Sequence, residues 1–179
     1  MPNFGVATVV FRGEELLLIQ REDAETWTVP GGGVEDGESL AAAAAREVRE
    51  ESGIEARLTR LVGLYSRPGF SRHMVVFAGE AVGGELRPQP GEAIDAGFFA
   101  PDALPDPLLW WFRQPIADAA AGRSGQVWTQ DAVWTLPFGP NDYGALRAEM
   151  KRSGLTRPEF YRRHLTHVGP DGERRDLPL

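Results

Sequence analysis

The sequence of 179 residues contains no cysteine. This absence excludes disulfide bonds, a catalytic thiolate and a cysteine-ligated zinc site, and it is compatible with a cytoplasmic location. Basic residues are also few, because 19 Lys and Arg stand against 26 Asp and Glu, which gives a formal net charge of −7 at pH 7. We therefore expect no broad contact with the phosphate backbone of DNA or RNA, and no nucleic-acid polymer as a partner.

Long apolar runs are missing as well. No segment approaches the roughly 20 apolar residues that span a membrane, and the N-terminal segment MPNFGVATVVFRGEE has no basic region before its apolar stretch. We therefore predict neither a membrane partner nor a secretory signal. A hydrophobic content of 42% is enough for a substantial core. The length predicts a domain over residues 1–125 and a C-terminal extension over 126–179 packed on the same domain, with a loose charged tail from about residue 169.

What the chain does contain is a dense group of carboxylates in the segment from Gly32 to Ile54, GGVEDGESLAAAAAREVREESGI. On a helix, Glu47, Glu50 and Glu51 fall within about 100° of one another, where like charges repel by roughly a few tenths of a kcal/mol per pair. Glu51 also reaches the edge of the apolar stripe, where a carboxylate is costly unless it is paired or binds a metal. A divalent cation would offset both costs, whereas the simpler interpretation is a solvated acidic surface.

Local signals define the ends of this helix. The three glycines at 31–33 form a loop that lets a phosphate or a carboxylate come close to the backbone. Ser39 is a good N-cap, and Gly53 suits the left-handed position after the last turn. We therefore expect the helix over residues 39–52. Its apolar stripe should consist of Leu40, Ala41, Ala44, Ala45 and Val48.

The same segment fits the pattern G-x5-E-x7-R-E-U-x-E-E-x-G-U, in which U is a bulky aliphatic residue, at every specified position. These positions are Gly32, Glu38, Arg46, Glu47, Val48, Glu50, Glu51, Gly53 and Ile54. In this respect the chain resembles the Nudix hydrolase family, over roughly residues 4–122. The resemblance implies an α+β fold, namely the α/β/α sandwich of that family with a mixed β-sheet, and a loop–helix–loop that holds divalent metal.

The resemblance also implies roles for individual residues. The metal-ligand positions of the family fall on Glu47, Glu50 and Glu51, with Mg²⁺ or Mn²⁺ as the cofactor. Arg46 would hold or orient these carboxylates by charge-assisted hydrogen bonds. The residues expected to support the site from the loop, or through water in the metal shell, are Gly32, Gly33 and Glu38.

The rest of the chain reads mainly as strands. Alternating apolar residues and glycine-containing turns predict strands over residues 4–12, 16–21, 27–29, 58–65, 73–82 and 96–100. The early position of one helix among them favours a mixed α+β order over regular βαβ units. Residues 106–122 predict a further helix with a break at Pro115, and residues 141–152 predict another. Thr156 and Glu159 have the spacing of a reciprocal N-terminal cap that begins a last helix.

Candidates for substrate binding lie outside the carboxylate segment. Residues 65–71, YSRPGFS, resemble the Pro-Gly segment downstream of that segment in ADP-ribose pyrophosphatases, a subgroup of the same family. The alternative is a plain loop between two strands. Arg67 and Arg72 could contact a diphosphate or a terminal ribose, and Arg21 could reach a phosphate.

The tryptophans allow several interpretations. Trp27 is expected in the core. Of Trp110 and Trp111, on a predicted helix, at least one should be buried, and the other could stack on an adenine. Trp128 and Trp134 could serve a homodimer interface as well as a base pocket.

Two acids precede the strand expected at 96–100. Nudix enzymes often supply an acidic residue from outside the carboxylate segment, so Glu92 or Asp95 could be a further metal ligand or the base that activates water. The alternative is two exposed acids in a loop. For the base we favour Glu50 or Glu92, with Arg46 as the residue that holds the catalytic carboxylates.

The predicted activity is metal-dependent hydrolysis of the diphosphate in a nucleoside diphosphate linked to another moiety, with ADP-ribose or a nucleotide sugar preferred. Two or more Mg²⁺ or Mn²⁺ ions would neutralise the diphosphate and lower the pKa of a water for in-line attack. One alternative is a pyrophosphohydrolase of normal or oxidised nucleoside triphosphates. Another is a non-catalytic nucleotide sensor of the same fold, which the complete set of three glutamates disfavours.

Overall fold

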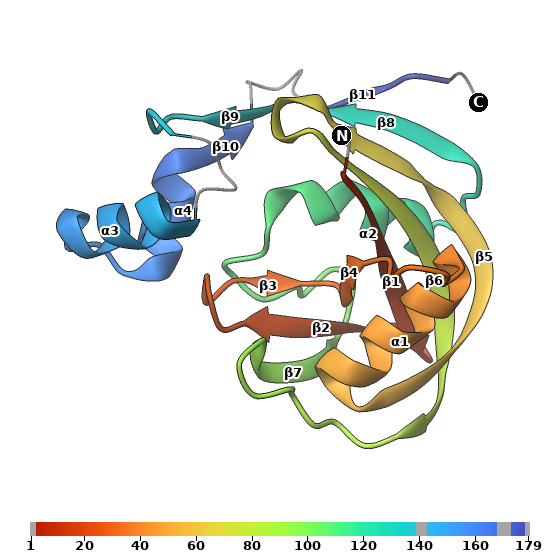
Figure 1. Ribbon diagram of the computed structural model, residues 1–179. Helices are drawn as coiled ribbons and strands as arrows, with labels where there is room; N and C mark the ends of the chain where they lie inside the picture. Colours follow the sequence, from red (N-terminus) through yellow and green to blue (C-terminus); the bar gives the residue numbers. More distant parts are fainter. Residues whose placement is uncertain (1–2, 139–142, 168–172, 178–179) are drawn as a thin grey trace.

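The computed structural model describes residues 3–138, 143–167 and 173–177 (Figure 1). Its strands are β1 (Asn3–Arg12), β2 (Glu15–Arg21), β3 (Trp27–Thr28), β4 (Gly31–Gly33), β5 (Ile54–Arg67), β6 (Arg72–Gly84), β7 (Ala93–Phe99), β8 (Gln126–Gln130), β9 (Ala132–Trp134), β10 (Leu165–His167) and β11 (Glu173–Arg175). Its helices are α1 (Leu40–Ser52), α2 (Arg113–Ala120), α3 (Tyr143–Ser153) and α4 (Arg157–His164), with single 3-10 turns at Pro68–Phe70 and Trp110–Phe112. None of the helices in these ranges is long and apolar enough to cross a membrane.

Nine of the strands form one mixed sheet in the order β11-β8-β5-β6-β1-β2-β3, with β4 paired to β1 and β7 paired to β2. The pairs β1–β6 and β5–β8 are parallel, and the remaining pairs of this sheet are antiparallel. The strands predicted before residue 105 are all present, and β5 and β6 extend beyond their predicted ends at both sides. A separate small sheet pairs β9 with β10.

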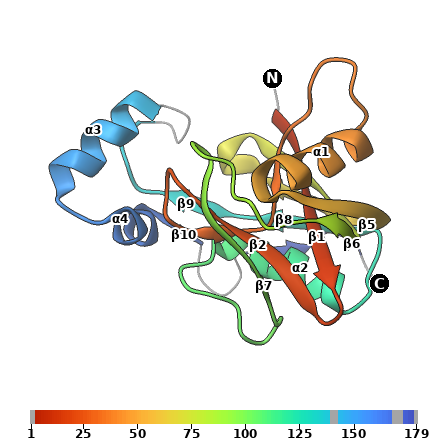
Figure 2. The same ribbon diagram turned by 90° about the horizontal axis from the view of Figure 1, so that it is seen from below.

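Helices cover both faces of the main sheet (Figures 1 and 2). Alternate residues of a strand point to opposite faces, and β1 is buried on both of its faces. Val6 and Val10 pack with residues of α1, whereas Ala7 and Val9 pack with residues of α2. The predicted α+β sandwich with a mixed sheet is therefore confirmed.

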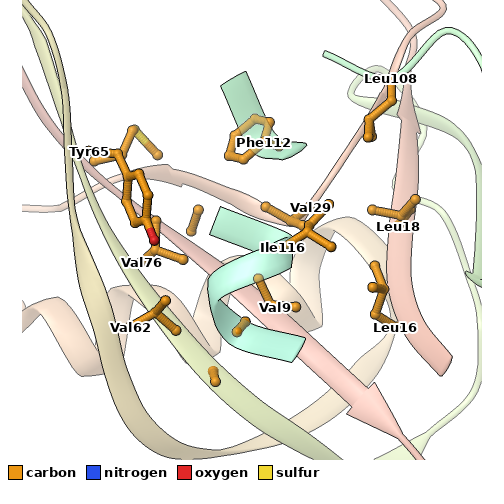
Figure 3. Close-up of a cluster of buried hydrophobic side chains, with 14 of the residues drawn as sticks. Val9, Leu16, Leu18, Val29, Val62, Tyr65, Val76, Leu108, Phe112 and Ile116 are labelled. Carbon is orange, nitrogen blue, oxygen red and sulfur yellow. The ribbon is translucent and has the colours of Figure 1, made fainter. Parts of the chain in front are cut away.

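The larger part of the core lies between the sheet and α2 (Figure 3). Leu16 and Leu18 of β2 meet Phe112 and Ile116 from the α2 side, and all four are buried. Trp27 joins this cluster with 9% of its surface exposed, which confirms its predicted place in the core. Phe112 is buried as well, while Trp110 and Trp111 both stay partly exposed, so the expectation that one of them is buried is wrong.

The buried face of α1 differs from the predicted stripe. Leu40 is 40% exposed and Ala41 is exposed too, whereas Glu47 and Glu51 are buried. The helix is turned so that these two carboxylates, rather than the first apolar residues, face the sheet. The reason is a set of polar contacts to β4, which are described in the next section.

The segment over residues 106–122 is helical only in part. Residues 107–109 instead bind the edge of β3, where the Trp27 amide donates to the Pro107 carbonyl (2.7 Å) and the Leu109 amide donates to the Trp27 carbonyl (3.0 Å). Pro115 does not break α2, because it lies in the first turn, where its missing N–H costs no helical hydrogen bond. Thr156 and Glu159 do form the predicted reciprocal cap, with the Thr156 amide donating to Glu159 Oε2 (2.9 Å).

The predicted loose tail contains a strand. Residues 173–175 form β11, which pairs with β8 at the edge of the main sheet. Gln130 donates to Glu173 Oε1 (2.6 Å), and the Asp176 amide donates to the Val127 carbonyl (2.8 Å). An uncovered strand edge leaves backbone groups unpaired, and pairing with β8 satisfies them, which charge and composition alone did not indicate.

We predict that Leu18→Ala lowers the free energy of unfolding by about 2–5 kcal/mol, because Leu18 is fully buried and its loss leaves a cavity. Leu61→Ala is the matched control, since Leu61 is 47% exposed, and should change stability by no more than about 0.5 kcal/mol. Urea unfolding of both variants measures the difference. Equal effects would contradict the assignment of the core.

Candidate active site

Helix α1 is fixed at both ends by the predicted caps. Ser39 Oγ accepts a hydrogen bond from the Ala42 amide (3.1 Å). At the other end Gly53 has φ 77°, a left-handed conformation that suits glycine, and its amide donates to the Arg49 carbonyl (2.9 Å). The caps thereby fix where the helix begins and ends, and its buried acids face β4.

The glycine loop is a short strand that receives these acids. β4 pairs with residues 5–7 of β1. The Gly31 amide donates to Glu51 Oε2 (2.7 Å). The Glu47 carboxylate lies so close to Gly32 that a Cβ at this position would stand 2.5–2.7 Å from its three atoms. Glycine is therefore required at position 32, because a side chain would displace Glu47.

Arg46 is the centre of a charged network. Its Nε and Nη2 donate to the two carboxylate oxygens of Glu38, both at 3.0 Å. Its Nη1 donates to Glu47 Oε1 and to Glu50 Oε2, both at 2.9 Å. Its Nη2 also donates to the Gly33 carbonyl (3.0 Å). One guanidinium thus ties together the loop after β4, the start of α1 and two of the three predicted metal ligands.

Negative charge is nevertheless in excess here. Burial raises the pKa of Glu51 to about 8, although the Gly31 amide lowers it, and the charges of Glu47 and Glu92 raise it further. Burial also raises the pKa of Glu47, against the effect of Arg46. Two buried carboxylates that repel each other in this way would be stabilised by a cation.

The three glutamates have the donor chemistry of a site for Mg²⁺ or Mn²⁺, which prefer oxygen ligands. Each uses one oxygen in a described hydrogen bond, namely Glu47 Oε1, Glu50 Oε2 and Glu51 Oε2. Within the described ranges, the second oxygen of each has no hydrogen-bond partner. The same residues do not already surround one point as a ready set of three metal ligands, because Arg46 draws Glu47 and Glu50 toward itself.

Of the two predicted acids, Glu92 lies just before β7 and is brought to the cluster, whereas Asp95 lies within β7. Its charge acts on both Glu47 and Glu51, and its carbonyl accepts from the Glu22 amide (2.8 Å). Asp95 is exposed, and its carboxylate accepts from the neighbouring Ala96 amide (2.8 Å).

The predicted substrate arginines separate into two groups. Arg21 lies near Glu51, whose pKa its charge lowers, and it forms a two-bond ion pair with Asp23 (2.8 and 2.6 Å). Asp23 was missed in the sequence, where its position two residues after Arg21 was the available signal. Arg67 and Arg72 lie at the tip of the β5–β6 hairpin, two residues beyond core residues of the α2 face, and thus on that face.

The side chain of Trp134 lies outside the described residues, so its predicted role in an interface or a base pocket is not addressed. Trp128 is partly buried and packs against the core beside β5. Trp111 stacks on Arg67, with 4.7 Å between the guanidinium carbon and the ring centroid.

Known proteins resemble this chain over part of its length. A family model described as NUDIX domain matches residues 1–119. A Bacillus subtilis (strain 168) protein, provisionally named as an 8-oxo-dGTP diphosphatase, is 36% identical over 97 residues, which are 54% of this chain and 65% of that protein. The NAD-capped RNA hydrolase NudC of Pectobacterium carotovorum subsp. carotovorum (strain PC1) is 39% identical over 102 residues, which are 56% of this chain and 39% of that protein. The chain therefore spans less than two thirds of the length of either relative.

A solved structure covers more of the chain. The crystal structure of an ADP-ribose pyrophosphatase from Streptococcus suis 89-1591 matches with a TM-score of 0.62 and 28% sequence identity. The match covers 69% of this chain and 94% of that chain. The fold is thus shared with that protein over most of its length.

The raised pKa of Glu51 makes the stability of the metal-free protein depend on pH. The folded protein keeps a proton on Glu51 up to about pH 8, whereas the unfolded chain releases it near the ordinary value of 4.5. Between these values the folded state binds more protons, so stability falls as the pH rises, by at most about 1.4 kcal/mol per pH unit. Urea unfolding from pH 5 to 8 in EDTA should show this fall.

Glu51→Gln should flatten the same profile, because the amide has no proton to release. Glu80→Gln is the control, since Glu80 is an exposed acid paired with Arg57 on β5. An equally steep fall in Glu51→Gln and in the control would contradict the assignment of the raised pKa to Glu51.

Proposed function

The chain belongs to the Nudix family, and from this we propose that it hydrolyses the diphosphate bond of a nucleoside diphosphate linked to another moiety, with Mg²⁺ or Mn²⁺ as cofactor. The observation that supports this most is the network in which Arg46 and the Gly31 amide hold Glu47, Glu50 and Glu51 in one place. A nucleotide sensor has no need of three neighbouring carboxylates on one helix, each with one oxygen that makes no hydrogen bond to a described residue.

The residues divide the work as follows. Glu47, Glu50 and Glu51 would hold the cation, which when bound neutralises the diphosphate and makes a water more acidic. Arg46 keeps Glu47 and Glu50 in position by the hydrogen bonds of its Nη1. Glu38 in turn positions Arg46, through two parallel hydrogen bonds that fix the plane of the guanidinium.

Glu92 is the better candidate for the base that takes the proton from the attacking water. The Glu50 carboxylate is already bound by Arg46. No hydrogen bond to the Glu92 carboxylate is found in the described ranges, and this exposed side chain is close enough for its charge to act on Glu47 and Glu51. A carboxylate that is exposed and not held by a cation can accept a proton without first breaking an ion pair.

ADP-ribose or a nucleotide sugar is the substrate class that we favour. Support comes from the likeness to a structure that is itself an ADP-ribose pyrophosphatase. The alternative, a nucleoside triphosphate, is supported by the relative named for 8-oxo-dGTP. The name of NudC refers to capped RNA. A capped oligonucleotide should therefore be tested as a substrate too, and its cleavage would contradict our expectation that no nucleic-acid polymer is a partner.

The experiment that tests the function is a product-resolved assay of the full chain with Mg²⁺ and with Mn²⁺. The substrates are ADP-ribose, nucleotide sugars, normal and oxidised nucleoside triphosphates, and a capped oligonucleotide. Two phosphorylated halves from a diphosphate-linked substrate are expected. Release of pyrophosphate from a triphosphate would favour the alternative substrate. Binding without any turnover in either metal would overturn the hydrolase assignment in favour of a sensor.

We predict that Glu50→Gln and Glu51→Gln each lower kcat by about a thousandfold, because loss of a metal ligand removes several kcal/mol of charge stabilisation. Far-ultraviolet circular dichroism should show an intact fold. Glu80→Gln, an exposed acid of β6, is the matched control and should keep full activity. Near-normal turnover in Glu50→Gln or Glu51→Gln would refute the assignment of the metal site.

A second pair of variants tests the base. Glu92→Gln should lower kcat by about a hundredfold or more, whereas Asp95→Asn, three residues further on, should have little effect because Asp95 does not reach the cluster. Steady-state kinetics at saturating metal separates these outcomes. An equal loss of kcat in the two variants would contradict the assignment of Glu92 as the base.

A further inference from the structure

Two arginines face each other on the α2 side of the sheet, and neither pairs with an acid within residues 3–138, 143–167 and 173–177. Arg67 of β5 and Arg72 of β6 are partners in the register of the hairpin. Arg67 is only 5% exposed, and the Nε atoms of both side chains are buried without a hydrogen-bond partner. Neither guanidinium has an ion pair or a hydrogen bond with any residue in the described ranges.

This arrangement is costly for the protein alone. A buried charge without a partner loses its hydration and gains nothing in return. Burial and, as a smaller effect, the charge of Arg72 lower the pKa of Arg67 to about 9, so Arg67 stays charged at neutral pH. Contact with the Trp111 ring offsets only a part of this cost.

Two acids close to Tyr65, which lies two residues before Arg67 on the same face, are bonded to other donors. Asp118, which is fully buried, accepts hydrogen bonds from Tyr65 Oη (2.8 Å), Gln114 Nε2 (3.0 Å) and Arg123 Nη1 (2.8 Å). Glu173 accepts from Gln130 Nε2 (2.6 Å). These two acids are therefore bonded to donors other than Arg67 and Arg72, which have no acidic partner among the residues that the structure describes.

On the next two strands, β8 and β11, further N–H donors have no hydrogen-bond partner among the described residues. Trp128 of β8 stands opposite Tyr65 in the register, and Arg175 of β11 stands opposite Trp128. The Trp128 Nε1 and the Arg175 Nε are buried without a hydrogen-bond partner, and the guanidinium of Arg175 lies 5.1 Å from the Trp128 ring. Several buried N–H groups and two tryptophan rings thus lie along one face of the sheet.

These groups are within reach of a molecule bound at the carboxylates. Gly33 of β4 pairs with Gly5 of β1, which pairs with Met74 of β6, and Arg72 lies two residues before Met74. With strands about 4.8 Å apart and residues about 3.4 Å apart, the backbones at Gly33 and Arg72 are separated by roughly 12 Å. Both arginines lie on the face opposite the carboxylates but at the tip of the β5–β6 hairpin, so a nucleoside or sugar joined to a diphosphate would reach them around this end of the sheet.

We propose that Arg67 and Arg72, with Trp111 and Trp128 beside them, form a subsite for an oxyanion, a phosphate or a carboxylate, on one of the two moieties that the scissile diphosphate joins. This inference rests on the proposed function. It narrows the substrate class to nucleoside diphosphate derivatives that carry an additional anionic group. An oxyanion accepts several N–H bonds at once and neutralises both guanidinium groups.

The test uses substrate pairs that differ in one charged group. ADP-ribose 2′-phosphate against ADP-ribose reports on a phosphate, and UDP-glucuronate against UDP-glucose reports on a carboxylate. We expect kcat/KM of the full chain to be at least about tenfold higher for the anionic member of one pair, as one charge-assisted hydrogen bond allows. The pair that shows the difference identifies the anion.

Variants link this preference to the subsite. Arg67→Met and Arg72→Gln should bring the ratio within a pair to about one, while Arg57→Gln, an exposed arginine on the same strand as Arg67, should leave it unchanged. Arg67→Met should not lower the melting temperature, because it removes an unpaired buried charge. A large fall in melting temperature with the ratio intact would show that Arg67 is only structural, and would overturn the proposal. The partly exposed Arg72 carries the test if Arg67→Met does not fold.

Binding in EDTA, measured by isothermal titration calorimetry, separates this inference from the hydrolase activity. Tighter binding of the anionic member that is lost in Arg72→Gln, without turnover in metal, would retain the subsite and refute the hydrolase. Turnover of both members of each pair at equal rates would retain the hydrolase and refute the subsite. Equal or undetectable binding of both members in EDTA would also refute the subsite.

Discussion

The arrangement of this protein around its carboxylates depends on one guanidinium. Arg46 contacts the carbonyl of the glycine strand and three glutamates at the same time. Without it, the acids would repel one another, and the turned face of α1 would have no partner for its charges. The rotation of α1, the close approach of Glu47 to Gly32 and the length of the loop before Ser39 all serve this set of contacts.

The sheet separates two regions of opposite charge. On the α1 side, the buried carboxylates of Glu47 and Glu51 repel each other, and a cation would stabilise them. On the α2 side, Arg67 and Arg72 have no acidic partner among the described residues. The net charge of −7 is therefore compatible with the anionic substrate that we propose, because local charge and not the total governs contact at short range.

Much of this could be predicted from short-range patterns. The strands, the caps at Ser39 and Gly53, and the grouping of Glu47, Glu50 and Glu51 follow from spacing and local chemistry, and they are present. The exposed position of Leu40 could not be predicted, because the rotation of a helix is decided by contacts with distant β4. The same holds for β11, whose charged residues form a strand only because β8 offers an open edge.

The roles of some single residues could be predicted from the sequence. Arg46 and Glu38 follow from the family pattern, and the structure shows them in contact. The separation of Arg67 and Arg72 from the acids could not be seen in the sequence, because it depends on which face of a strand each side chain takes. A shift of one residue in register would have placed both arginines on the other face.

The pairing of β11 with β8 has a further consequence for how the molecule is assembled. The carboxylates and their supports, apart from Glu92, lie within residues 31–51, so they form from contacts that are short in sequence. The donors of the opposite face extend from Arg67 to Arg175, more than half of the chain. During synthesis, the first group can therefore become complete while much of the chain is still on the ribosome, whereas the second must wait for its last strand.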